Sequence, residues 1–245
     1  MTKWPEGYGR FIFDEVGSTL DVARDMASAQ AAPFWVLAHR QTASRGRRGR
    51  AWAMPEGNFA ATLVLRTTDG PAQIALRSFV MSLALLRAFV DATRRADAFA
   101  LKWPNDVLLK GGKVAGILLE SGGAGSVAIG VGINLVAAPS QDEVEAGAVR
   151  PVSVLGETMV HLTPEPFLDA LAHHYATLEQ QFTELGFAPI RNGWLAHAAR
   201  LGEVITARTG SDTRTGTFED VDPDGQLVLR GARGVERIAA ADVYF

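Results

Sequence analysis

Hydrophobic and polar positions in the first half of the chain predict helices and strands in alternation. Residues 18–21 (Ser-Thr-Leu-Asp) have the composition of a capping box, and apolar side chains follow on one face of the helix that it would open. A longer amphipathic helix is predicted over residues 74–95. Gly111-Gly112 indicates a hairpin. Runs rich in apolar and β-branched residues predict strands at 34–38, 58–65, 98–103, 107–109, 114–120 and 127–135.

The second half of the chain changes character twice. Residues 137–165 are rich in proline, glycine and acidic residues, so we expect a surface excursion there, followed by helices at 164–185 and 188–199. From Gly202 onward, short β-rich runs alternate with Asp and Gly turns, which predicts strands near 203–209, 214–221, 226–230 and 235–239. The overall prediction is an α+β fold, with one domain over residues 1–200 and a small β-barrel over residues 201–245.

Charge and composition narrow the class of protein. The chain has 245 residues, a formal net charge of −3 and no cysteine. The charge argues against a surface devoted to nucleic acid, and the lack of thiols excludes disulfides, thiolate metal sites and an enzyme thioester. The first ten residues lack the pattern of a secretion signal, and the longest apolar segment, residues 79–90, is too short to span a bilayer. We therefore expect a cytoplasmic enzyme with no membrane span.

The segment Arg45–Arg50 places four arginines and two glycines in six residues. Its like charges favour a loop that becomes ordered when an anion neutralises it, and guanidinium groups match the oxygens of carboxylates and phosphates. A solvated basic loop or a nucleic-acid contact would explain the segment equally well when it is taken alone.

Lys102 stands at the end of a predicted strand, and Pro104 fixes the direction of the chain after it. A lysine placed this way suits a carboxylate or phosphate that must be held during a reaction, although a strand-end turn with an exposed lysine is the ordinary alternative. Gly130 and Gly132 occupy alternate positions of another strand. This spacing predicts either a flat floor for a ligand or close packing of a helix on the strand.

Together these segments occur in the order and spacing of the biotin–protein ligase family, which the chain resembles over essentially its whole length. The resemblance rests on Ser18-Thr19, on Gln41 with Arg45–Arg50 and Trp52, and on Lys102–Asp106, Lys113–Glu120 and Gly130–Asn134. It implies a catalytic domain like those of class II aminoacyl-tRNA synthetases and biotinyl/lipoyl ligases, with a mixed sheet and flanking helices. It also implies that residues 201–245 form an SH3-like β-barrel.

The resemblance further implies a reaction in two steps. ATP activates biotin as biotinyl-5′-AMP with release of pyrophosphate, and biotin then passes to a lysine of the biotin carboxyl carrier domain of a carboxylase. Mg²⁺ would accompany ATP without a dedicated set of metal ligands. Lys102 and Arg47 would be the catalytic residues. The residues implied to bind biotin are Ser18, Thr19, Leu20, Gln41, Arg45, Gly46, Arg47, Lys102 and Gly116. Those implied to bind ATP and the adenylate are Arg47, Arg50, Trp52, Lys102, Asn105, Lys113 and Asn134.

Two residues depart from the family pattern. Ser44 stands where the family's loop usually has its first glycine, and its side chain restricts φ at that hinge. Leu20 stands where asparagine is common after Ser-Thr, which removes one polar contact to the ligand. These departures leave a biotin-binding homologue without catalysis as an alternative.

Other functions remain open at this point. Lipoate–protein ligase shares the fold and chemistry, but Gln41 and the Gly/Arg loop fit the biotin pattern better, and a lipoyl or octanoyl transferase would need a cysteine. Some family members carry an N-terminal DNA-binding domain. Only about 17 residues precede Ser18, too few for a helix-turn-helix, so we expect no DNA partner. We expect a monomer or a homodimer, and the five histidines show no metal-ligand spacing.

Overall fold

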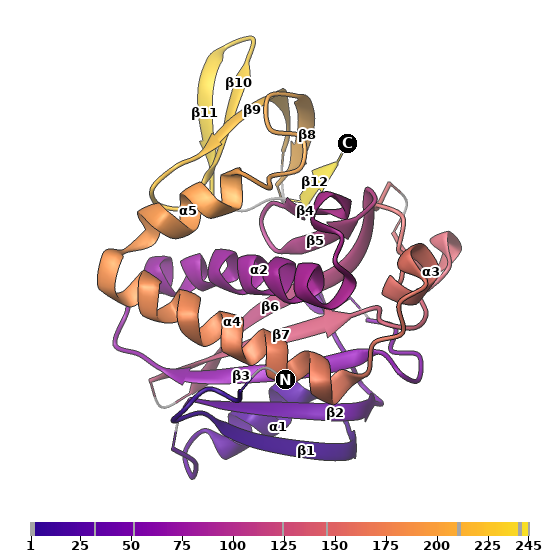
Figure 1. The fold of residues 1–245 in the computed structure, drawn as a ribbon. Coiled ribbons are helices and arrows are strands. Elements are labelled where there is room, and N and C mark those ends of the chain that lie inside the picture. The colour runs from indigo at the N-terminus through magenta and orange to yellow at the C-terminus, as the bar shows by residue number, and fades with distance from the viewer. Residues whose placement is uncertain are drawn as a thin grey trace.

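A seven-stranded mixed sheet forms the centre of the structure (Figure 1). The computed structural model describes residues 3–31, 33–50, 52–123, 125–145, 147–209, 212–239 and 242–244. β1 and β2 are parallel, and every other neighbouring pair in the sheet is antiparallel. The strands lie in the order β1 (Gly9–Val16), β2 (Phe34–Gln41), β3 (Phe59–Arg66), β7 (Ser126–Ile133), β6 (Gly112–Gly123), β5 (Asp106–Leu109) and β4 (Phe99–Lys102).

Helices cover both faces of this sheet. α1 (Thr19–Met26) packs on β2, β3 and β7, while α2 (Pro71–Thr93) packs on β4, β5 and β6 and carries α4 (Pro164–Leu185) and α5 (Phe187–Leu195) beside it. β2 is apolar at consecutive positions because both of its faces are covered. Phe34 and Val36 join the cluster under α1, and Trp35 and Leu37 join the main core. The expected α+β architecture is confirmed.

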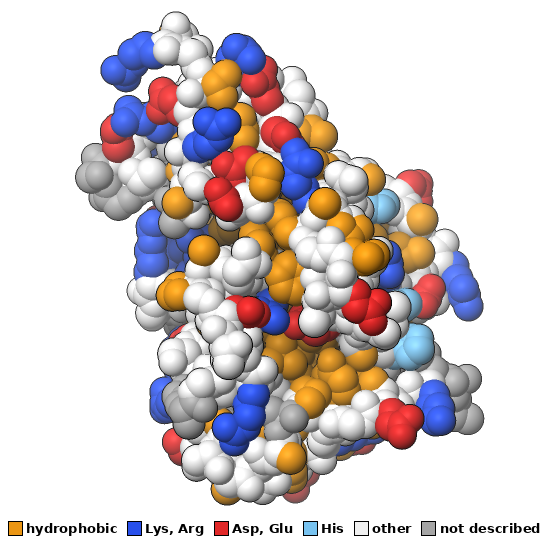
Figure 2. All heavy atoms as spheres, turned by 90° about the vertical axis from the view of Figure 1, so that its left-hand side faces the viewer, with side chains coloured by type: hydrophobic (Ala, Val, Ile, Leu, Met, Phe, Trp, Pro, Cys, Tyr) orange, Lys and Arg blue, Asp and Glu red, His pale blue; other side chains and the backbone are white. Residues whose placement is uncertain are grey.

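α2 extends on both sides of the apolar segment 79–90, which was judged too short to span a bilayer. Among the described residues it is the one helix long and apolar enough to cross a membrane by length and composition, but 72% of its apolar window is buried inside the protein. It contacts α4, α5 and three strands, so its apolar character is that of a core helix. In Figure 2, hydrophobic side chains gather in the middle of one face, and basic and acidic side chains are interspersed around them.

The C-terminal strands form a second, five-stranded antiparallel sheet with the order β11-β10-β9-β8-β12. It lies above α5 in Figure 1 and contacts the rest of the chain through several side chains. The Trp103 indole donates to the Gly225 carbonyl at 3.0 Å, and Arg191 pairs with Asp220. A domain boundary at residue 200 stays a prediction. The strands are β8 (Val204–Arg208), β9 (Thr213–Val221), β10 (Leu227–Gly231), β11 (Gly234–Ile238) and β12 (Asp242–Tyr244).

Two local predictions about the helices around the seven-stranded sheet are wrong. α1 begins after Ser18 as expected, but the Ser18 side chain makes no capping hydrogen bond, so no capping box forms. The last helix was expected to reach residue 199, whereas α5 ends at Leu195. It ends early because the backbone of residues 197–199 hydrogen-bonds on both sides of Leu101 in β4, at 2.8 Å each.

Residues 137–165 are also less peripheral than predicted. They contain a short helix, α3 (Val154–Thr158), and Val152 and Val154 are buried in the main core. Pro151 forms a bridge to Lys113 at the start of β6, so this segment is fixed to the sheet.

The sequence analysis missed two strands, β1 and β12. β1 carries Arg10, Asp14 and Glu15 at the exposed edge of the sheet, and β12 has only three residues.

Gly225→Ala is expected to destabilise the contact between the C-terminal sheet and α2. Gly225 has φ +78°, and an added Cβ would lie 2.7 Å from Leu76 and 3.1 Å from Phe79 in α2. Backbone strain and overpacking together should lower the free energy of unfolding by roughly 2–4 kcal/mol, measured by urea denaturation. Gly111→Ala is the matched control, because its φ is +80° and nothing lies within 4 Å of the added Cβ. An equal loss in both variants would contradict the packing argument.

Candidate active site

One cavity of about 760 Å³ collects every residue that the sequence analysis assigned to a ligand. It opens where α1, β6, β7, the arginine-rich loop and β12 meet. The assigned residues in its wall are Ser18, Thr19, Leu20, Gln41, Arg45, Gly46, Arg47, Arg50, Trp52, Lys102, Asn105, Lys113, Gly116 and Asn134. The volume is within the range of pockets that enclose small ligands and cofactors.

One end of the cavity is polar but uncharged. Ser18 and Thr19 are both buried at the start of α1. Thr19 donates from its backbone N–H and from its hydroxyl to the same oxygen of Gln41, at 2.7 and 3.0 Å. The Gln41 amide nitrogen has a weak contact of 3.6 Å with the Met54 sulfur. This end offers hydroxyl and amide groups to a neutral polar ligand head.

Side chains from other parts of the protein pack directly against the glycines of β6 and β7. A Cβ added to Gly130 would lie 3.1 Å from Leu20, and one added to Gly132 would lie 2.7 Å from the Trp52 indole. Trp52 also covers Gly116 at 3.3 Å. The predicted bare floor is therefore wrong at these positions. The glycines instead let Leu20 of α1 and the indole of Trp52 lie close against the sheet.

The other end of the cavity is cationic and centred on a buried carboxylate. Lys102 and Asp106 are each 8% exposed, and Lys102 Nζ lies 3.8 Å from Asp106 Oδ2. Lys113 Nζ lies 2.7 Å from Asp106 Oδ1. Burial lowers the pKa of Lys102, and Asp106 opposes that shift. Burial alone would raise the pKa of Asp106, but Lys113 and Lys102 outweigh it and hold that pKa below its usual range. The alternative of an exposed strand-end lysine is excluded.

The arginine-rich loop, here residues 44–50 together with Trp52, is closed at its neck by hydrogen bonds. Ser44 Oγ donates to the Trp52 carbonyl at 2.5 Å, and Gly46 N–H donates to the Arg50 carbonyl at 2.7 Å. A short 3₁₀ turn, Arg47–Gly49, forms the tip. A glycine at position 44 could not make this side-chain hydrogen bond. Ser44 therefore fixes the neck of the loop.

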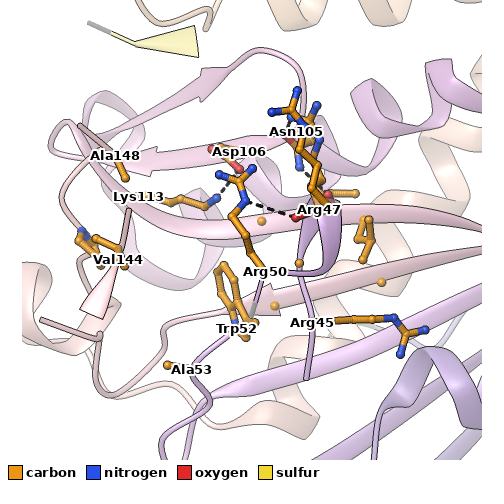
Figure 3. A pocket seen from close by; sticks show the side chains of 18 of the residues that line it. Arg45, Arg47, Arg50, Trp52, Ala53, Asn105, Asp106, Lys113, Val144 and Ala148 are labelled. Carbon is orange, nitrogen blue, oxygen red and sulfur yellow. Dashed lines mark hydrogen bonds and ion pairs between the residues drawn. The ribbon is translucent and has the colours of Figure 1, made fainter. Parts of the chain in front are cut away.

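Carboxylates and an amide from several elements hold the arginines of this loop. Figure 3 shows Arg47 beside Asn105, and Arg50 near the Lys113–Asp106 pair. The side chain of Asp242 in β12 lies 2.7 Å from Arg48, 3.3 Å from Arg50 and 3.4 Å from Arg47. Arg50 also pairs with Glu145 at 2.5 Å. Arg47 donates to Asn105 at 3.2 Å, and burial lowers its pKa. The tip of the loop is therefore neutralised by acids from elsewhere in the chain.

Arg45 behaves differently from the other arginines of the loop. Its guanidinium group pairs with Asp21 of α1 and Glu120 of β6, each at 2.9 Å, and these two partners raise its pKa. In Figure 3 its side chain extends away from Arg47, Arg50 and Lys113. Arg45 lines the cavity, yet its charge is already matched by two acids.

Three buried polar atoms in the cavity wall make no hydrogen bond within the described part of the chain: Trp52 Nε1, Asn134 Oδ1 and Asp106 Oδ1. Asp106 Oδ1 is ion-paired with Lys113, so Trp52 Nε1 and Asn134 Oδ1 remain unsatisfied. The Asn134 amide nitrogen is used, since it donates to the Val152 carbonyl at 3.1 Å. An unsatisfied donor and acceptor in a cavity wall are the kind of groups that a bound ligand completes.

Comparison with known proteins agrees with this geometry. Residues 11–134 match the Biotin/lipoate A/B protein ligase family, and residues 201–245 match the Biotin protein ligase C terminal domain. The chain is 54% identical over 232 residues to a biotin–[acetyl-CoA-carboxylase] ligase of Paracoccus denitrificans, covering 93% of this chain and 97% of that protein. The chain belongs to the biotin/lipoate A/B protein ligase family. It is also 35% identical to the Mycobacterium tuberculosis protein of the same name, with 91% and 82% covered.

Solved structures of this family share the fold. The biotin protein ligase of Aquifex aeolicus, in complex with biotin and ATP, superposes with a TM-score of 0.82 at 24% identity, over 96% of this chain and 97% of that one. The Leishmania major biotin protein ligase, in complex with biotinyl-5-AMP, superposes with a TM-score of 0.66 at 25% identity, over 96% and 100%. The biotin–protein ligase resemblance drawn from the sequence motifs is confirmed at the level of the family.

Several residues of the site were not found by sequence reasoning. Asp106 lies within the motif Lys102–Asp106 but was given no role of its own. Its position four residues after Lys102 was the signal that could have identified it. Asp242 and Glu145 lie far from the loop in sequence and carry no local signal for their contacts with it. The segment 139–151, which was expected on the surface, supplies part of the cavity wall.

Asp242→Asn is expected to loosen the arginine-rich loop. The substitution keeps the shape of the side chain but removes the charge shared by Arg47, Arg48 and Arg50. Without ligands, trypsin should cleave after these arginines about tenfold faster, with fragments identified by mass spectrometry, because protection falls as the loop opens more often. Asp212→Asn is the control, since Asp212 pairs with Arg214 within the C-terminal sheet. Equal cleavage rates in the two variants would show that Asp242 does not hold the loop.

Proposed function

We propose that this chain is an ATP-dependent biotin–protein ligase that modifies a lysine on the biotin carboxyl carrier domain of a carboxylase. The observation that carries the proposal is a single cavity with a neutral hydrogen-bonding end at Gln41 and a buried cationic end at Lys102. Biotin has the matching pattern, a neutral ureido ring at one end and a carboxylate at the other. The names of the Paracoccus and Mycobacterium relatives support acetyl-CoA carboxylase as the source of the carrier.

The residues divide between the two substrates along the cavity. Ser18, Thr19, Leu20 and Gln41 would surround the ureido ring, with Arg45, Gly46 and Gly116 near the rest of biotin. Arg50, Trp52, Asn105, Lys113 and Asn134 would take the nucleotide. The unsatisfied atoms of Trp52 and Asn134 support that side, since a base or ribose carries donors and acceptors. Lys102 and Arg47, which both line the cavity, would act on both substrates.

The first step joins two anions. The biotin carboxylate attacks the α-phosphorus of ATP, a carboxyl O–P bond forms, and the bond to pyrophosphate breaks. Like unit charges about 4 Å apart repel by roughly 4 kcal/mol at an effective dielectric constant of 20. Lys102 and Arg47 would offset this repulsion and stabilise the charge that develops on the phosphate oxygens. Asp106 would keep Lys102 protonated in spite of its burial.

The second step needs no nucleophile from the enzyme. The carrier lysine attacks the acyl carbon of the adenylate, an amide bond forms, and AMP leaves with the electron pair of the broken C–O bond. The adenylate is a mixed anhydride that water would hydrolyse. The arginine-rich loop, closed at its neck by Ser44, would cover it and exclude water until the carrier binds.

The proposal extends to the remaining partners. Mg²⁺ would enter as the counter-ion of ATP and screen the departing pyrophosphate. Within the described ranges no group of three or more His, Asp and Glu side chains is placed to hold a metal, so we assign Mg²⁺ no protein ligands. A cytoplasmic location, a monomer or homodimer, and the absence of a DNA partner stay predictions.

Pyrophosphate release tests the proposal directly. With ATP and Mg²⁺, the protein should release pyrophosphate when biotin is added and should not when lipoate is added. Lys102→Ala should lower the biotin-dependent rate about 100-fold or more, because it removes charge stabilisation in the transition state. Circular dichroism would check that the variant is folded.

Each other outcome has a distinct meaning. Release with lipoate alone would make the chain a lipoate ligase, and release with neither would leave biotin binding without catalysis. If Lys102→Ala kept most of its activity, the role assigned to Lys102 would be wrong.

Asp106→Asn should move the alkaline limb of the pH–activity profile to lower pH. The active form of Lys102 is protonated, so activity is present below its pKa and is lost as pH rises through it. Burial lowers this pKa and Asp106 raises it, so removing the carboxylate lets the pKa fall further. Initial rates at saturating substrates, from neutral to alkaline pH, would show the shift. An unchanged profile, with Asp169→Asn on α4 as the control, would refute the role of Asp106.

A further inference from the structure

Thr62 begins a chain of hydrogen bonds that ends in the cavity. It lies in the middle of β3, paired with Val36 on one side and Gly130 on the other, and it is fully buried. Its hydroxyl donates to the Thr19 hydroxyl at 2.9 Å. The Thr19 hydroxyl in turn donates to Gln41 Oε1 at 3.0 Å. The Thr62 side chain thus reaches Gln41 through the Thr19 hydroxyl.

The direction of this chain is set by what each group can donate. A hydroxyl has one hydrogen, so Thr19 can give its hydrogen to Gln41 only while it accepts from Thr62 or leaves that lone pair empty. Gln41 Oε1 receives a second hydrogen bond from the Thr19 backbone N–H at 2.7 Å. Both lone pairs of the Gln41 oxygen are therefore occupied. The side of Gln41 that remains for a ligand is its amide N–H₂ group, which can only donate.

We propose that Thr62 is a positioning residue that selects ligands carrying a carbonyl at the uncharged end of the cavity. Through Thr19 it holds the Gln41 amide with its donor toward the ligand. This inference rests on the proposed function, in which that end receives the ureido ring of biotin. The ring's carbonyl accepts the Gln41 hydrogen bond, whereas the dithiolane ring of lipoate has no carbonyl to offer. Thr62 touches no substrate and acts through Thr19 and Gln41.

A valine at this position isolates the hydrogen bond from the packing. Val has nearly the shape of Thr and suits a central strand, but it cannot donate. In Thr62→Val the Thr19 hydroxyl loses its donor and becomes free to turn away from Gln41. Gln41 Oε1 then keeps the bond from the Thr19 backbone N–H alone, so the amide is held less firmly in its orientation. The cost should appear in the binding of the ligand head and nowhere else. Thr62→Ser restores a hydroxyl at the same place.

Binding measured by isothermal titration calorimetry tests the proposal with two probes. One probe is biotin, and the other is 2-iminobiotin, in which a protonated imine donor replaces the ureido carbonyl. Thr62→Val should weaken biotin binding by roughly three- to tenfold and weaken 2-iminobiotin binding much less, so that its preference for the carbonyl falls. Thr62→Ser should recover most of the biotin affinity. In turnover assays, KM for biotin should rise while kcat and the KM for ATP stay unchanged.

Thr93→Val is the matched control, because the Thr93 hydroxyl is also buried and donates to the Phe89 carbonyl within α2. It should change neither affinity. Biotin binding unchanged in Thr62→Val, or an equal loss for both probes, would overturn the role of Thr62 and leave the ligase proposal intact. A failure of the unmodified chain to bind biotin at all would overturn the ligase proposal and this inference with it.

Discussion

The charged end of the cavity depends on one buried carboxylate. Asp106 lies between two lysines, and removing a charged group from water costs several kcal/mol per ion unless an opposite charge compensates it. β4 and β5 place the pair correctly, because Lys102 and Asp106 are direct partners in their antiparallel register. The turn between them is fixed by buried Trp103, whose indole is bonded to the C-terminal sheet. Strand register therefore determines where the cation of the site stands.

The arginine-rich loop obeys the same electrostatic constraint with partners from distant parts of the chain. Its four guanidinium groups would repel one another if they were left alone. Asp21 and Glu120 compensate Arg45 at the base of the loop, while Asp242 and Glu145 compensate the arginines near its tip. The conformation of this loop is consequently a property of the whole fold, since α1, β6 and β12 each contribute a side chain to it.

Sequence reasoning reached the fold class and the membership of the cavity wall, the first from local patterns and the second from the family resemblance that the ordered motifs carry. Period-two and helical patterns located most elements, and the ordered motifs located the residues that meet in the cavity. It missed β1, whose edge position leaves charged residues among its apolar ones, and α3, whose helix is one turn long. It also missed the partners of the arginines and the tryptophan covering Gly132, since tertiary contacts leave no trace in local composition. Ser44 was visible as a departure from the family pattern, but only coordinates show the bond that it makes.

The position of β12 bears on how this protein is handled in the laboratory. Asp242, Val243 and Tyr244 all line the cavity, and Asp242 is held by the loop. A purification tag or fluorescent fusion attached next to β12 would start beside the cavity and add bulk or charge there. Kinetic constants from such a fusion would report the tag as well as the enzyme. β1 lies at the opposite edge of the sheet from β4, so an attachment on the side of β1 is expected to disturb the cavity less.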